Sequence, residues 1–202
     1  MDRKHLRKPL MRDYPEHPNV KVPDDADIAV SLGIENLRVG RHYLRDEDRA
    51  RVGALWLDTF WILRVLPSFD HHGLVGVAAA HGEKFRGKTS SGWMKGFLAS
   101  NGSIAFQELE TDPLPHVVAR LPLLQKSKSM FLDGVGYQLR IESLQIKSTL
   151  DFANPTLPEL VAVETTCWEL ADKIARESGE KSLTAFTKTW QRYHERGGIT
   201  MP

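Results

Sequence analysis

The chain has 202 residues, a length that fits one domain with a short appendage. Its hydrophobic content of 41% and charged content of 26% are those of an ordinary globular protein, and its formal net charge of +1 excludes a general electrostatic attraction to nucleic acid. Cys167 is the only cysteine, which excludes an intramolecular disulfide and a multi-cysteine zinc site and indicates a small core residue. No apolar run approaches the roughly 20 residues that span a bilayer, and the N-terminus lacks the apolar segment of a secretory signal. We therefore expect a cytoplasmic protein with no membrane partner.

Residues 1–27 predict an extended arm in front of a single domain at 28–202. The proline density of the arm opposes a helix or a central strand, and its charge changes from basic to acidic along the chain. A basic tail for nucleic acid or anionic lipid is an alternative, but so few charges on a nearly neutral chain do not favour it. The prolines of the arm are Pro9, Pro15, Pro18 and Pro23.

A helix is predicted near 47–66, because apolar residues recur there at helical spacing. Acidic residues precede the run and Arg64 follows it, as the helix dipole favours, and Pro67 would end the helix. The residues at helical spacing are Val52, Leu55, Trp56, Thr59, Phe60 and Leu63.

The segment 70–102 holds many small residues and several histidines. It predicts a short buried strand at 74–80, a short helix at 91–100 and a turn at Asn101-Gly102. Further strands are expected from Ile104 and over 116–121.

A meander is predicted from Met130 to Phe152, with a favoured turn pair at Asp133-Gly134. Strict alternation follows, which indicates an antiparallel sheet with one buried and one wet face. The residues assigned to the buried face are Tyr137, Leu139, Ile141, Ile146, Ser148, Leu150 and Phe152.

Two amphipathic helices should close the chain. Thr156 and Glu159 predict a capping box for the first helix, Gly179 its end, and Ser182 the cap of the second. The predicted fold is therefore α+β: an antiparallel sheet of about five or six strands, covered on one face by helices near 47–66, 157–177 and 183–195.

One segment matches a phosphate-binding motif: Gly82–Thr89 satisfies G-x-x-x-x-G-K-[ST]. In a P-loop, Gly82 and Gly87 would let backbone N–H groups cradle phosphates, Lys88 would reach the β- and γ-phosphates, and Thr89 would hold Mg²⁺, so Mg-ATP is the implied cofactor. Bulky residues within the motif, an antiparallel sheet and the absence of a convincing partner Asp oppose this reading, because Asp133 fits a turn better. A nucleotide-binding enzyme is therefore kept as an alternative to a basic surface loop.

A metal-dependent enzyme is a weaker alternative. His71, His72, His81 and Glu83, with Asp70 beside them, are ligand types of first-row metals, and His81-x-Glu83 is similar to part of the zinc deaminase signature. That signature needs a later P-C-x-x-C, which this chain lacks. Adjacent histidines on an extended segment also point to opposite faces.

The segment 132–174 resembles small bacterial proteins of the polymorphic-toxin immunity type. The resemblance implies a cytosolic inhibitor that binds and occludes a cognate toxin, and it includes no catalytic residue and no cofactor. The residues that carry it are Leu132, Asp133, Gly134, Tyr137, Leu139, Ile141, Phe152, Asn154, Pro155, Thr156, Pro158, Glu159 and Leu160.

A blocking protein needs surface complementarity and a few anchor residues, not a tuned active site. The loop rich in glycine and basic residues offers such anchors, and the sequence shows no coherent set of catalytic residues beside it. We therefore expect a protein-binding inhibitor rather than an enzyme, with its oligomeric state left open. The expected partner-binding residues are Lys84, Phe85, Arg86, Lys88 and Trp93.

Overall fold

The computed structural model describes residues 23–45, 51–68, 70–115 and 134–195. Its elements are α1 (Asp25–Ser31), β1 (Gly40–Arg45), β2 (Arg51–Pro67), β3 (Gly73–Phe85), β4 (Lys88–Thr89), β5 (Trp93–Ser100), β6 (Ser103–Glu108), β7 (Val135–Ser143), β8 (Lys147–Ala153), α3 (Pro158–Ser178) and α4 (Lys181–Glu195). The predicted strands at 116–121 and 130–132, the residue Asp133 and most of the N-terminal arm lie outside the described residues.

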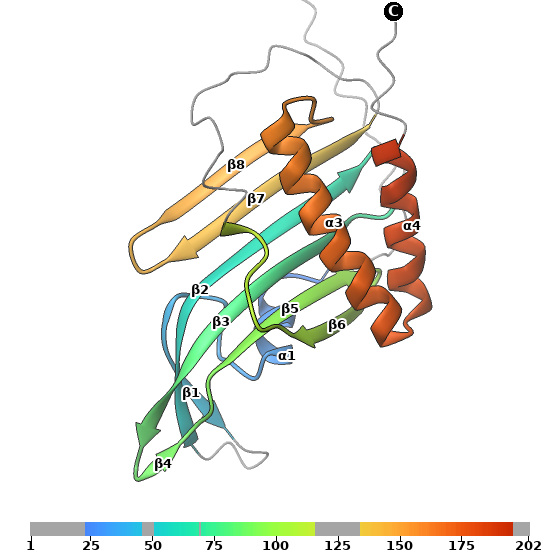
Figure 1. The fold of residues 1–202 in the computed structure, drawn as a ribbon. Helices are drawn as coiled ribbons and strands as arrows, with labels where there is room; N and C mark the ends of the chain where they lie inside the picture. Colours follow the sequence, from blue (N-terminus) through green and yellow to red (C-terminus); the bar gives the residue numbers. More distant parts are fainter. Residues whose placement is uncertain (1–22, 46–50, 69, 116–133, 196–202) are drawn as a thin grey trace, which may run out of the picture.

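The α+β fold with an antiparallel sheet is confirmed. Eight described strands form the sheet, six of them in the order β6-β5-β3-β2-β7-β8, with β1 on β2 and β4 on β3 (Figure 1). All of these pairings are antiparallel. β1 pairs with the first half of β2, from Arg51 to Leu57, and β7 pairs with its second half, from Thr59 to Pro67. The pairing of β2 with β3 shifts register between Leu57 and Thr59, so a β-bulge at Asp58 separates the two halves.

The predicted helix near 47–66 is wrong, because this run forms the 17-residue strand β2. Leu55 and Leu57 pack on one face of the sheet, while Trp61 and Leu63 pack on the other. A strand that is buried on both faces is apolar almost throughout and therefore lacks the alternation by which a strand is recognised. Its aromatic and β-branched residues suit a sheet better than a helix.

The predicted helix at 91–100 is also wrong, since residues 93–100 form β5. Gly96, a poor residue for a helix interior, has a packing role in this strand. A Cβ added to Gly96 would lie 3.2 Å from a methyl carbon of Leu170 and 3.3 Å from one of Ile174, both on α3. The absence of a side chain at Gly96 thus lets the helix lie close to the sheet.

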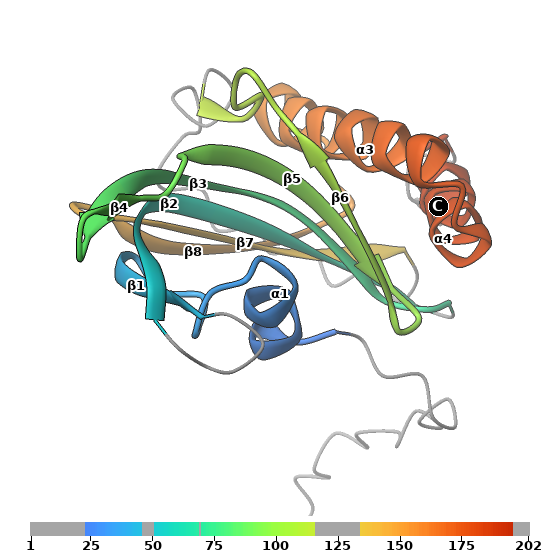
Figure 2. The ribbon, with the colours of Figure 1, turned by 90° about the horizontal axis from the view of Figure 1, so that it is seen from below.

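Helices cover both faces of the sheet, not the single face that was predicted. Figure 2 shows α3 and α4 on one side and α1 on the other. Ile28 and Ala29 of α1 are fully buried. With Leu32, Ile34 and Leu37 they pack onto residues of β2, β3 and β5. Asp24 caps α1 by accepting hydrogen bonds from the backbone N–H groups of Ala26 and Asp27. The end of the predicted arm is therefore helical.

The two terminal helices are where the apolar stripes predicted them, but their caps differ. α3 begins at Pro158 with Leu157 at the N-cap and no side-chain cap, so the predicted capping box of Thr156 is absent. Proline has no backbone N–H, and the N–H groups of the first helical turn have no acceptor within the helix. Pro158 can therefore begin the helix without losing a hydrogen bond. Gly179 ends α3 in the left-handed conformation at φ 69°, as predicted. Ser182 lies inside α4 and donates a hydrogen bond to the Ser103 hydroxyl at 2.8 Å.

A buried polar network joins both terminal helices to β7. The Tyr137 hydroxyl donates to Glu164 Oε1 and accepts from Trp190 Nε1 at 2.9 Å, while His194 Nδ1 lies 2.9 Å from Glu164 Oε2. Burial, and then the nearby Glu164 charge, raise the pKa of Tyr137. Cys167 is fully buried in the same core, as predicted, and burial raises the pKa of its thiol, so it is not an activated nucleophile.

We predict that Tyr137→Phe lowers the free energy of unfolding by about 2–3 kcal/mol, because it leaves a buried carboxylate oxygen without its donor. Urea denaturation at pH 7 measures this loss. The wild type should also lose stability as the pH rises above the ordinary tyrosine pKa of about 10, since the folded state keeps Tyr137 protonated, and Tyr137→Phe should reduce that loss.

The matched control is Tyr193→Phe. Its hydroxyl donates to Asp70 at 3.1 Å in a partly exposed position, so we expect a loss below about 1 kcal/mol. Equal losses in the two variants would contradict a structural role for the buried network.

Candidate functional site at the hairpin end of the sheet

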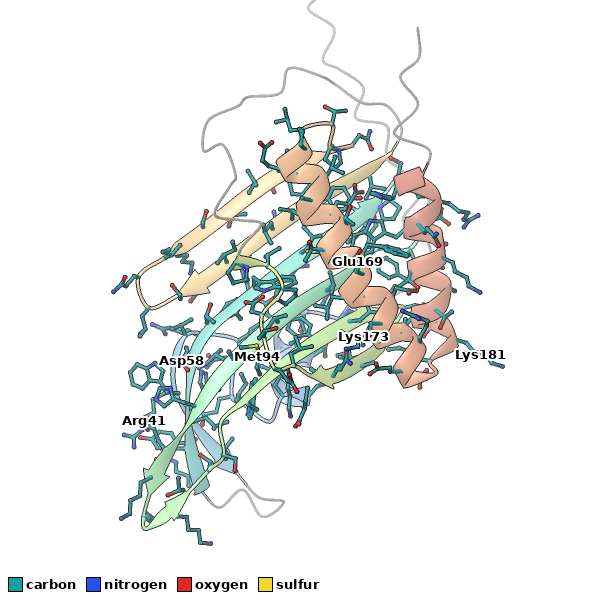
Figure 3. The ribbon with its side chains drawn as sticks, in the orientation of Figure 1. Arg41, Asp58, Met94, Glu169, Lys173 and Lys181 are labelled. Carbon is teal, nitrogen blue, oxygen red and sulfur yellow. The ribbon has the colours of Figure 1, made fainter. Side chains whose placement is uncertain are left out.

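One end of the sheet extends beyond the two terminal helices (Figure 1). It consists of β1, the first half of β2, the last part of β3, and β4, and is called here the hairpin end. Most of the candidate residues from the sequence lie in it. Figure 3 shows Arg41 and Asp58 in this part of the molecule, away from Lys173 on α3 and Lys181 on α4.

The residues of the phosphate-binding motif form the β3–β4 hairpin. Lys84 faces Thr89 and Phe85 faces Lys88, with Arg86 and Gly87 in the turn. Their φ angles are 49° and 81°, and two positive values are what a type I′ turn requires. A P-loop needs a strand, a loop and then a helix whose N-terminus faces the phosphate. Here a strand follows in place of the helix, so the geometry that would support Mg-ATP binding is missing from this segment.

The glycines of the motif have structural roles. A Cβ on Gly82 would lie 1.6 Å from the Ser90 carbonyl oxygen, because the connection from β4 to β5 passes directly over β3. The Ser90 hydroxyl holds this connection by donating to the Ala54 carbonyl oxygen on β2. Gly87 is needed for its positive φ in the turn. Chain crossing and turn geometry therefore account for the spacing that matched the motif.

The hairpin end is rich in exposed cationic side chains. They are Arg41 on β1, Arg51 on β2, Lys84 on β3, Arg86 in the turn and Lys88 on β4. Arg41 Nε lies 2.7 Å from Glu83 Oε2. Lys84 and Lys88 have no ion pair with any residue in the described part of the chain.

Two aromatic residues lie near these cations: Tyr43, which the sequence did not single out, and Trp56, which it assigned to the apolar face of a helix. The guanidinium groups of Arg41 and Arg51 lie 5.3 and 4.2 Å from the ring centroid of Tyr43. Trp56, which is half-buried, faces Arg41 on β1 and His81 on β3 in the strand register. These groupings could have been found from the sequence only by reading 51–67 as a strand.

His81 and Asp58 form a pair at the bulge of β2. The distance from His81 Nδ1 to Asp58 Oδ1 is 2.9 Å, and their side chains are 60% and 41% exposed. Such exposure leaves the pair in contact with solvent rather than in a site that excludes water. Asp58 can orient the exposed imidazole of His81. The pair lacks the enclosed surroundings that shift the pKa values of general acid–base groups in active sites.

The expected metal ligands do not come together. His81 and Glu83 lie at the hairpin end, whereas His71 and His72 precede β3 at its opposite end. The strand residues 73–80 lie between His72 and His81, which places the two groups about 30 Å apart. Within the described residues, no group of three or more His, Cys, Asp or Glu side chains converges. Burial, and then the neighbouring His71, lower the pKa of His72.

Trp93 lies apart from the other expected anchors. It begins β5, pairs with Ala80 and packs, half-buried, against the core under α1. The Lys95 ammonium lies 5.3 Å from its ring centroid. Three of the expected anchors, Lys84, Arg86 and Lys88, are therefore gathered at the tip, while Trp93 supports the core.

No protein-family model, curated protein or solved structure matches this chain. None of the described helices combines the length and the apolar character that crossing a membrane requires. The functional argument therefore rests on the contacts and charges at the hairpin end.

We predict that Gly82→Ala costs more than about 2 kcal/mol of stability, because the new methyl group overlaps a backbone carbonyl that cannot rotate away. Gly87→Ala is the control. Nothing lies within 4 Å of a Cβ at Gly87, so only backbone strain of about 1–2 kcal/mol is expected. Urea denaturation of the two variants measures the difference, and a smaller loss for Gly82→Ala would contradict the crossing as the reason for this glycine.

Proposed function

We propose that the protein is a protein-binding inhibitor that docks an acidic surface of its partner with the hairpin end. The observation that carries this proposal is the gathering of five exposed cations on a protruding part of the sheet, two of which, Arg41 and Arg51, lie against the ring of Tyr43. The resemblance of the segment 132–174 to immunity proteins makes a cognate toxin the proposed partner.

The strands of the hairpin end suit binding because they are ordered before the partner arrives. β1 and β3 both pair with β2, and β4 pairs with β3, so the backbone that carries these side chains is held in the sheet. A preformed surface avoids much of the entropy cost of ordering a loop on association. Tyrosine and arginine are also the residue types that contribute most to hot spots in protein interfaces.

The charge pattern favours a protein partner over nucleic acid. Glu83 and Asp58 lie at the same end of the sheet as the cations. A phosphate backbone attracts a surface of one sign, whereas a protein surface can match a mixture of signs. Mixed charges also discriminate against wrong partners through repulsion.

The immunity proposal predicts a toxin-like gene beside the gene of this protein. Co-expression should protect cells from that gene product, and the two chains should co-purify as a stable complex. If cells expressing the full chain gain no protection from any adjacent gene product, the toxin is not the partner.

The docking proposal predicts that Lys84→Glu/Lys88→Glu weakens the complex with that gene product by roughly ten- to a hundredfold, because both cations would face carboxylates of the partner. Calorimetry at low and at physiological salt should show the larger loss at low salt. The matched control is Lys173→Glu/Lys181→Glu, the same two reversals on α3 and α4, which should leave the affinity unchanged (Figure 3). A complex that tolerates the hairpin-end reversals would overturn docking through this surface.

A further inference from the structure

In the part of the chain that the structure describes, β8 is an edge strand of the sheet. Among the described residues it pairs only with β7. The backbone hydrogen bonds from Ser143 to Ile146 at 2.7 Å and from Asn154 to Val135 at 3.0 Å set the phase of the ladder. Since hydrogen-bonded pairs in an antiparallel ladder recur every second residue, the N–H and C=O groups of Lys147, Thr149 and Asp151 point away from β7.

This edge carries few of the features by which proteins block strand addition. It has no proline, and its two charged residues, Lys147 and Asp151, have opposite signs, so the edge does not repel a copy of itself. Two large apolar side chains in the turn before it are exposed, Leu144 at 67% and Ile146 at 57%. An exposed edge with apolar neighbours is a natural template for another strand.

We infer that β8 pairs antiparallel with β8 of a second copy of this chain, about a two-fold axis at Thr149. In this register Lys147 faces the partner's Asp151, and Asp151 faces the partner's Lys147. Ile146 faces the partner's Phe152. Within one chain, Phe152 is half-buried and stacks on Tyr137, with 4.9 Å between the ring centroids. The open backbone groups of Lys147, Thr149 and Asp151 then meet those of the partner and complete the ladder.

The charges select this register over its neighbours. Moving the axis by one residue places Lys147 opposite Thr149 or Ala153 instead of Asp151 and removes both ion pairs. Lys147 is available for the contact, because its side chain is 77% exposed although it lies 3.4 Å from Glu142. Asp151 accepts only a single hydrogen bond from Gln138, at 3.1 Å, among the contacts of the described residues. Isologous pairing of this kind is the commonest way in which identical chains associate.

Sedimentation velocity of the full chain, from low micromolar to several hundred micromolar, tests the pairing. We expect a monomer–dimer equilibrium in the wild type and a monomer for Thr149→Pro. The N–H of Thr149 points away from β7, so proline there removes a donor from the open edge without breaking a β7–β8 bond. A wild type that stays monomeric over the whole range, or a dimer that survives Thr149→Pro, would overturn the inference.

The register has its own test in a charge exchange. Asp151→Lys places two lysines opposite each other twice in the dimer and should raise the dimer dissociation constant roughly tenfold or more. The double variant Lys147→Asp/Asp151→Lys restores both opposite-charge pairs and should recover most of that loss. Thermal melting confirms that each variant is folded. A double variant that dimerises no better than Asp151→Lys would refute pairing centred on Thr149. None of these changes lies in the hairpin end, so the test is independent of the proposed docking surface.

Discussion

The burial of β2 on both faces is the constraint on which the rest of the structure depends. One side of this strand packs under α3 and α4, and the other packs over α1 and the segment that follows it. Because β2 is 17 residues long, it extends past the helices and carries β1 on the edge that β7 occupies further along. The hairpin end exists because β2 continues beyond the part of the sheet that α3 and α4 cover (Figure 1).

The sequence predicted the elements whose burial is one-sided. Of the strands buried on both faces, it predicted the 74–80 part of β3 but took β2 and β5 for helices. β7 alternates between buried and half-buried residues from Val135 to Arg140, and the amphipathic helices α3 and α4 each have one apolar stripe, so local periodicity reports their environment directly. In β2 the residues on both faces are apolar, and enough of them fall at helical spacing to imitate an amphipathic helix. The covering helix α1 was also missed. Ile28 and Ala29 belong to a helix of only seven residues, which is too short to show a clear helical period.

The candidate site was predictable in composition but not in arrangement. The sequence alone indicated that Lys84, Arg86 and Lys88 are surface groups, because they cluster in a polar, glycine-containing loop. Tyr43 and Arg51 could not be associated with them, since their position at the same end of the sheet depends on the pairing of β1, β2 and β3. The phosphate-binding motif shows the converse: Gly82 and Gly87 occur at the right spacing for reasons of chain crossing and turn geometry.

The pairing of β2 with β7 also has a consequence for how the chain folds. The β2–β3 hairpin is local, but the Thr59 hydroxyl donates to the carbonyl oxygen of Glu142, 83 positions later in the chain. Contacts between residues so distant in sequence carry a large loop-closure entropy and slow folding. Until β7 is synthesised and docks, the far edge of the most apolar strand lies open, and unpaired strand edges are where chains misassemble. The order of synthesis therefore leaves the second half of β2 without its β7 partner until residues 135–143 have been made.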